Sequence, residues 1–185
     1  MIAAVRARPA LRAAALSAYI FAVELTRALV AHVPYAAVPA LVLGGVALVI
    51  SARGFSPERL GLTGTRLPLR ILGGFALAAV LLLPAAVRPG APLLPLAFAL
   101  PAVAISIGQE IAFRGALYAA LEEVGGAPMA ILGSTMLWTL VHAFSHPPAF
   151  LAAVATAGLL LALWRWAFRD LVAPLVAHVI ADVAL

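Results

Sequence analysis

Residues 108–115 read Gly108-Gln109-Glu110-Ile111-Ala112-Phe113-Arg114-Gly115 and lie inside a long apolar run. Glu110 and Arg114 are four residues apart, so on a helix they share one face and can form an ion pair. Inside a bilayer each charge alone costs roughly 2.5 to 3.5 kcal/mol on insertion scales, so charges without a role are rare there. This pair therefore marks a candidate site, and the rest of the chain is interpreted as its scaffold.

The composition is that of a polytopic membrane protein. Of the 185 residues, 65% are hydrophobic and 10% are charged, far from the average soluble domain. The net charge of +5 comes from arginine alone, and the arginines punctuate apolar segments. They therefore favour membrane orientation over nucleic-acid binding. The chain has no cysteine, which excludes disulfides and a thiol nucleophile.

The apolar runs predict an all-α, polytopic transmembrane bundle of about seven membrane segments. We expect them at residues 13–33, 35–51, 70–87, 92–123, 128–144, 149–168 and 171–185. Gly73-Gly74 should interrupt the third segment, which should end near Pro84, and Pro95 and Pro101 should break or kink the start of the fourth. Gly125-Gly126 should turn the chain between the fourth and fifth segments.

We expect residues 1–185 to form a single membrane domain, in which residues 1–91 supply N-terminal helices and a loop and residues 92–185 carry the motifs. Ser56-Pro57-Glu58 predicts a short surface helix, with serine as N-cap and proline at the first helical position.

Arginine placement predicts a cytoplasmic N-terminus, and abundant Ala, Gly, Pro and Arg without Lys suggest a bacterial protein, hence a bacterial inner membrane. Most arginines fall on one predicted side: Arg6, Arg8 and Arg12, the loop at 52–70, and the turn with Arg165 and Arg169. Arg88, before the predicted turn at Pro89-Gly90, falls on the other side.

Two later apolar segments each contain a matching polar pattern. Trp138 lies four residues before His142, and His178 lies four residues before Asp182, so each pair shares a helix face. Two histidines, two carboxylates and an arginine in three apolar helices are too costly to be incidental. The three motifs therefore predict one shared site.

The depths of these residues are compatible with one site. Glu110 lies 15 residues before Gly125 and His142 lies 17 after it, so at about 1.5 Å per residue a hairpin brings them level. His178 lies only about eight residues after the turn near Asp170, so by residue count it is closer to the membrane surface than Glu110 and His142. The difference disappears if the fourth helix extends beyond the membrane, as Glu122 and Glu123 indicate.

Each motif also has a structural interpretation, as an ion pair or hydrogen bond between helices. A structural role is preferred for four residues: Glu24 and Arg27 as a mutual ion pair, Trp138 as packing and His146 as a surface residue.

The order and spacing of the motifs resemble the CPBP family of CAAX proteases and bacteriocin-processing enzymes, also called the Abi family. Its pattern is Glu-Glu-x-x-x-Arg, then aromatic-x-x-x-His, then His-x-x-x-Asn/Asp. The matching residues are Glu110 and Arg114, Trp138 and His142, and His178 and Asp182, with Leu60-Gly61-Leu62 similar to the family's linker. The resemblance covers residues 105–185 and implies an intramembrane endopeptidase of glutamic or metallo type.

One residue departs from the family pattern. Gln109 stands where the family has a first glutamate, the residue thought to activate water, and an amide cannot accept a proton at neutral pH. Three explanations remain open. Either Glu110 acts as the base, or the chain is a silent relative that binds a peptide or confers immunity, or the substitution deliberately silences the carboxylate.

In an active enzyme a desolvated carboxylate takes a proton from water. His142 would hold or activate that water, His178 and Asp182 would stabilise the oxyanion, and Arg114 would orient Glu110. With Gln109 these are the candidate catalytic residues. No cofactor is expected, although zinc on Glu110, His142 and His178 is the alternative.

The expected partners are membrane lipids and a peptide or protein segment near the membrane surface, with no nucleic acid. A transporter is disfavoured because the sequence contains no inverted repeat.

Overall fold

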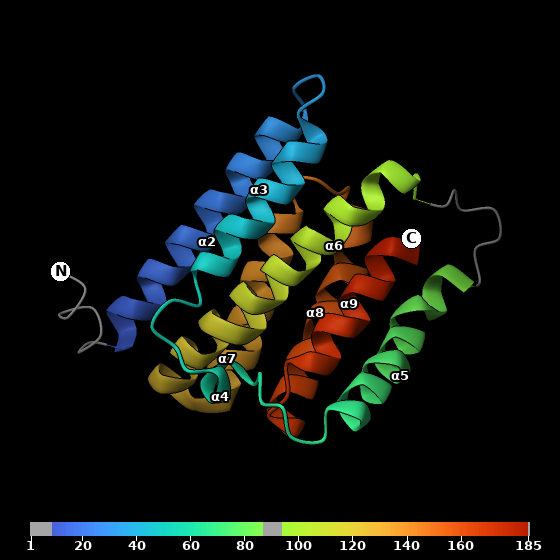
Figure 1. Cartoon of the computed structure of the whole chain (residues 1–185). Helices are drawn as coiled ribbons and strands as arrows, with labels where there is room; N and C mark the ends of the chain where they lie inside the picture. Colours follow the sequence, from blue (N-terminus) through green and yellow to red (C-terminus); the bar gives the residue numbers. More distant parts are fainter. Residues whose placement is uncertain (1–8, 87–93, 185) are drawn as a thin grey trace.

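The computed structural model describes residues 9–86 and 94–184, and within these ranges the chain is helical with no strand (Figure 1). The elements are α2 (Pro9–Ala31), α3 (Ala37–Ile50), α4 (Pro57–Leu60), α5 (Leu67–Ala86), α6 (Leu96–Glu110), the π-helix η1 (Ile111–Leu117), α7 (Tyr118–His142), α8 (Pro148–Phe168) and α9 (Val172–Ala184). The all-α expectation is confirmed for the described residues, and each predicted apolar segment forms a helix.

Helix α6, which begins the first motif, lies in the middle of the bundle between α3 and α9 (Figure 1). Its contact with α3 is a backbone contact, because a Cβ on Gly45 would collide with the carbonyl of Ala104 and a Cβ on Gly108 with the backbone of Gly45. On other sides α2 packs on α7, α7 on α8, and α5 on α9. The C-terminal part of α6, with Gln109 and Glu110, is thus buried, whereas Leu96 and Leu100 near its start are exposed.

The third predicted segment differs from expectation. Gly73 and Gly74 do not interrupt α5, which runs unbroken to Ala86, past the predicted end at Pro84. A Cβ on Gly73 would lie 2.6 Å from Trp164, and one on Gly74 would lie 2.6 Å from Val176. The two glycines therefore serve close helix packing, the usual use of small residues between membrane helices.

The proline and glycine predictions for the fourth segment are met in part. α6 begins directly after Pro95, but it continues through Pro101 without a break. Gly125 (φ −144°) and Gly126 (φ +66°) leave the helical conformation within α7. The predicted hairpin turn is therefore present, and positive φ at Gly126 is a conformation that glycine adopts without strain.

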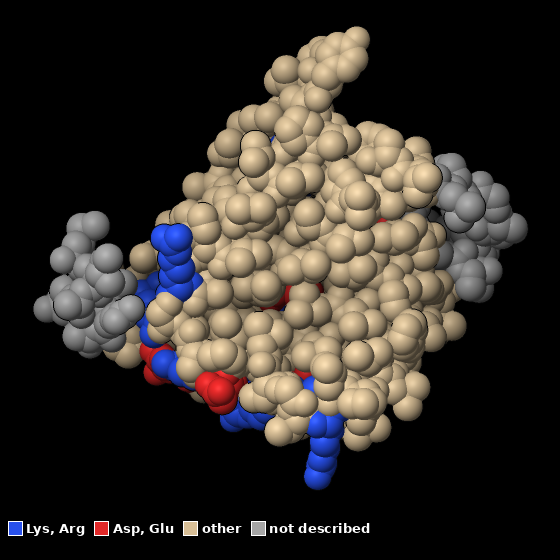
Figure 2. Space-filling model, viewed as in Figure 1, with Lys and Arg blue, Asp and Glu red and all other residues tan. Residues whose placement is uncertain are grey.

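Among residues 9–86 and 94–184, three helical stretches are long and apolar enough to cross a membrane: Pro9–Ala31, Leu96–His142 and Pro148–Phe168. Ala37–Ile50, Leu67–Leu83 and Val172–Ala184 are shorter apolar helices. Large hydrophobic side chains are exposed along most of these elements, and Figure 2 shows an outer face that is uncharged over most of its area.

Charged side chains gather at the end of the bundle where α4 lies (Figure 2). Ser56 caps α4 by accepting a hydrogen bond from the backbone of Arg59, as predicted. Ion pairs at this end join Arg59 with Glu123, Arg169 with Glu122, and Arg70 with Asp170. Arg6, Arg8, Arg88 and the predicted turn at Pro89-Gly90 lie outside the described residues.

Candidate active site

The centre of the site is the ion pair between Glu110 and Arg114. Both side chains are 0% exposed, and Nη1 of Arg114 lies 3.0 Å from Oε1 of Glu110. Glu110 is the last residue of α6, and Arg114 lies in the π-helix η1 that follows. A π-turn is rare and is frequently found at functional sites.

Arg114 is fixed by two further contacts. Its Nη2 donates to the carbonyl of Gly158 on α8 at 3.3 Å, and its guanidinium lies 4.1 Å from the ring centre of Trp138, in cation–π contact. A Cβ on Gly158 would lie 2.8 Å from Trp138 and 3.2 Å from Nη2 of Arg114. Trp138 does pack, as expected, and it packs against the motif residues themselves.

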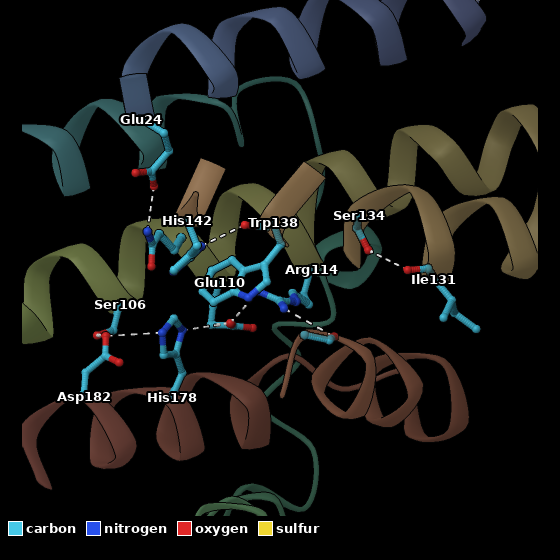
Figure 3. A network of polar contacts seen from close by, with 12 residues as sticks. Glu24, Ser106, Glu110, Arg114, Ile131, Ser134, Trp138, His142, His178 and Asp182 are labelled. Carbon is cyan, nitrogen blue, oxygen red and sulfur yellow. Dashed lines mark hydrogen bonds and ion pairs between the residues drawn. The ribbon is translucent and has the colours of Figure 1, made fainter. Parts of the chain in front are cut away.

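His178 on α9 joins the first motif to the third (Figure 3). Its Nδ1 lies 2.9 Å from Oε1 of Glu110, and its Nε2 lies 3.2 Å from Oδ2 of Asp182. Ser106 Oγ lies 2.7 Å from the same oxygen of Asp182 and 2.6 Å from the carbonyl of Ala102. Sequence reasoning missed Ser106, although its position one helical turn before Glu110 was a usable signal.

The network is balanced in charge. With Glu110 and Asp182 both ionised, each nitrogen of His178 has to donate, because an ionised carboxylate only accepts hydrogen bonds. The ring then carries both protons and a positive charge. Glu110 and Asp182 then offset Arg114 and His178. Buried charges persist when they are paired in this way.

His142 is close to this network without being hydrogen-bonded to it. Its Nδ1 lies 2.8 Å from the carbonyl oxygen of Trp138. A carbonyl only accepts, so Nδ1 carries the hydrogen and Nε2 remains an acceptor. The ring centres of His142 and His178 lie 4.2 Å and 5.0 Å from that of Trp138, so the second motif reaches the third through this tryptophan.

Gln109 faces a different helix. Its Nε2 donates to Oε1 of Glu24 on α2 at 2.7 Å, while Oε2 of Glu24 accepts from Nε of Arg27, also at 2.7 Å. The predicted pair between Glu24 and Arg27 is therefore present, but the contact with Gln109 was missed. Neighbours on a helix point about 100° apart, which is why Glu110 can face α9 while Gln109 faces α2.

The residues proposed for zinc do not fit that metal in this arrangement. Over residues 9–86 and 94–184, no group of three or more His, Asp or Glu side chains is spaced to hold a metal ion. Zinc also needs a free lone pair on each ligating histidine, and both nitrogens of His178 are occupied by carboxylates.

Three polar atoms of the site residues are fully buried without a partner among the described residues: Oε2 of Glu110, Nε of Arg114 and Nε1 of Trp138. Buried polar atoms are usually hydrogen-bonded, and an unpaired one calls for an explanation such as a water or a bound group. These atoms are therefore where a reacting water or a peptide group would find free hydrogen-bonding capacity.

The fold and the site define an all-helical, apolar protein with a buried carboxylate–histidine centre. The sequence model described as Type II CAAX prenyl endopeptidase Rce1-like matches residues 91–184. That range is half of the chain and contains all three motifs, so the chain belongs to this family of membrane-embedded proteases. The family expected from the motifs is confirmed. No curated protein and no solved structure matches the chain.

Proposed function

We propose that this chain is an intramembrane endopeptidase that adds water to a peptide bond at Glu110, His142, His178 and Asp182. The observation that carries the proposal is the polar network that joins Glu110, Arg114, His178 and Asp182 and leaves one oxygen of Glu110 without a partner. The family supports it, since its members are proteases.

In the proposed reaction Glu110 acts as the base through Oε2. Arg114 and His178 hold its other oxygen, and Nε2 of His142 is free to accept the second hydrogen of the water. Glu110 takes one proton, the hydroxide forms the C–O bond, and the same proton passes to the leaving nitrogen as the C–N bond breaks. General-base assistance of this kind is typically worth about 10² to 10⁴ in rate.

The role expected for His178 requires one exchange of partners. Both of its nitrogens are engaged within the protein. To stabilise the oxyanion, the Nε2–H group of His178 must donate its hydrogen bond to the substrate oxygen in place of Asp182. Asp182 can be displaced because its side chain is 36% exposed, whereas Glu110 is 0% exposed.

The substrate we propose is a peptide at a membrane surface. The family description refers to prenyl CAAX substrates, in which a C-terminal Cys-aliphatic-aliphatic-X sequence is lipidated on the cysteine. A leader peptide next to a membrane anchor is the second candidate. Both present an apolar anchor and an extended segment to a site inside the bundle.

Cleavage by the purified chain in phospholipid vesicles tests the function. The probes are a farnesylated CAAX peptide and a membrane-anchored peptide library with randomised residues beside the anchor, read by mass spectrometry. We expect cleavage by the natural chain and a loss of about 10² to 10⁴ in Glu110→Gln. Equal cleavage by both would exclude Glu110 as the base, and a chelator-sensitive activity restored by Zn²⁺ would replace the metal-free proposal.

Gln109 supports a second candidate function, a silent relative that holds a peptide without cutting it. In that case neither the natural chain nor Gln109→Glu cleaves any probe. Glu110→Ala and His142→Ala would still weaken capture of the peptide by the vesicles.

We also propose that seven segments cross the membrane with the N-terminus in the cytoplasm. A Cβ added at Gly64 would have no neighbouring atom within 4 Å, so a side chain there has free space. Tyr35 is fully exposed in the turn between α2 and α3. Gly64→Cys should label from the cytoplasmic side and Tyr35→Cys from the opposite side. Labelling of both from one side would refute this topology.

A further inference from the structure

The contact between Glu24 and Gln109 joins a buried carboxylate to the site from outside the three motifs. Glu24 is 0% exposed on α2, and its two oxygens accept from Gln109 and Arg27. Both oxygens of the Glu24 carboxyl group therefore serve as acceptors, one for Nε2 of Gln109 and one for Nε of Arg27. The Gln109 amide must therefore turn its Nε2 toward α2.

This orientation leaves the other end of the amide available. Among the described residues nothing donates to Oε1 of Gln109, and this oxygen is not one of the fully buried unpaired atoms. Gln109 as a whole residue is 4% exposed. Gln109 thus offers a fixed hydrogen-bond acceptor on the residue next to Glu110.

We propose that Glu24 is a positioning residue of the catalytic site, which fixes the amide of Gln109 so that Oε1 accepts a hydrogen from the attacking water or the substrate amide. Glutamine is then the residue at position 109 that complements a glutamate at position 24. The proposal rests on the proposed protease function.

A glutamate at position 109 would not simply restore a missing base. Its carboxylate would face that of Glu24 where the amide now donates over 2.7 Å. Two carboxylates at such a distance cannot both stay ionised, so they share a proton or move apart. Gln109→Glu alone should therefore disturb the site, whereas Glu24→Gln together with Gln109→Glu rebuilds one donor, one acceptor and the same net charge.

The experiment is a double-mutant cycle in the vesicle assay, with the peptide that the natural chain cleaves. The chains are the natural one, Glu24→Gln, Gln109→Glu and the double variant, and kcat, KM and the unfolding temperature are measured for each. Misplacing a catalytic group by about 1 Å can cost 10²-fold in rate. We expect each single variant to lose about that factor in kcat with KM little changed, and the double variant to recover most of it.

Arg27→Gln is the matched control, because it removes the other partner of Glu24 and leaves the amide of Gln109 in contact. If Glu24 is only structural, kcat follows the unfolding temperature in all variants, Arg27→Gln included. A Gln109→Glu chain more active than the natural one would overturn the proposal. The proposal would also be overturned if Glu24→Gln kept the full kcat, or if the kcat of the double variant were no higher than that of the less active single variant. Each of these leaves the protease function standing, whereas no cleavage by any chain overturns both.

Discussion

Two glutamate–arginine pairs are buried in this bundle, and along the sequence they look alike. Glu24 and Arg27 are three residues apart on α2, and Glu110 and Arg114 are four apart at the end of α6 and in η1. Each carboxylate is fully buried. They differ in their contacts with other helices. Glu24 accepts a hydrogen bond from the amide of Gln109, whereas Glu110 contacts His178 and has one oxygen without a partner. Spacing within a helix reveals a pair, but its partners across helices decide its chemistry.

The largest difference between the pairs should appear when the arginine is removed. Arg114→Met should destabilise the fold by about 3 to 5 kcal/mol, because it leaves Glu110 short of a buried counter-charge. It also loses the contacts with Gly158 and Trp138. Arg27→Met should cost less, since the Arg27 side chain is 10% exposed. Thermal unfolding in detergent measures both, and equal losses would contradict the comparison.

A glycine beside each pair gives a second, smaller test. Gly158→Ala pushes a methyl group against Trp138 and Arg114, and should cost about 1 to 3 kcal/mol and reduce cleavage. Gly44→Ala meets only the flexible stem of Arg27 at 3.0 Å. Its helix-propensity gain of roughly 1 kcal/mol should offset most of the crowding. If Gly44→Ala destabilises the fold more than Gly158→Ala, the Arg27 side chain is packed more rigidly than Arg114 and Trp138.

Two serines test the edge of the site. Ser106 and Ser134 are fully buried, and each Oγ lies 2.6 Å from the carbonyl four residues earlier. Only Ser106 also contacts Asp182. Ser106→Ala should cost about 0.5 to 1.5 kcal/mol and lower kcat, whereas Ser134→Ala should leave kcat unchanged. A matching loss of kcat in both variants would remove Ser106 from the site.

The smallest effect is expected far from both pairs, at the charged end. Arg169 pairs with Glu122, but its side chain is 67% exposed. Arg169→Gln should change stability by less than about 1 kcal/mol and leave cleavage intact. A larger loss of stability would mean that this ion pair couples α8 to the hairpin.

The sequence allowed the local part of the site to be predicted and little of the long-range part. Spacing of four residues correctly paired Glu110 with Arg114 and His178 with Asp182, because that rule depends on one helix alone. The contact of His178 with Glu110 spans 68 residues, and that of Gln109 with Glu24 spans 85. Both depend on the depth and rotation of separate helices, which periodicity does not fix. Gly73 and Gly74 were misjudged for the same reason, since the helices they touch are distant in sequence.

The π-helix after Glu110 changes which face of the helix each later residue occupies, compared with a regular α-helix of the same sequence length. Each π-type hydrogen bond spans five residues where an α-type bond spans four, so the segment Ile111–Leu117 holds more chain per turn than an α-helix. Beyond it, residues matched by counting along a regular helix are assigned to the wrong face. Glu122 and Glu123, whose partners are Arg169 and Arg59, would be among those misplaced. A one-residue gap at the π-helix restores the correspondence between position and face.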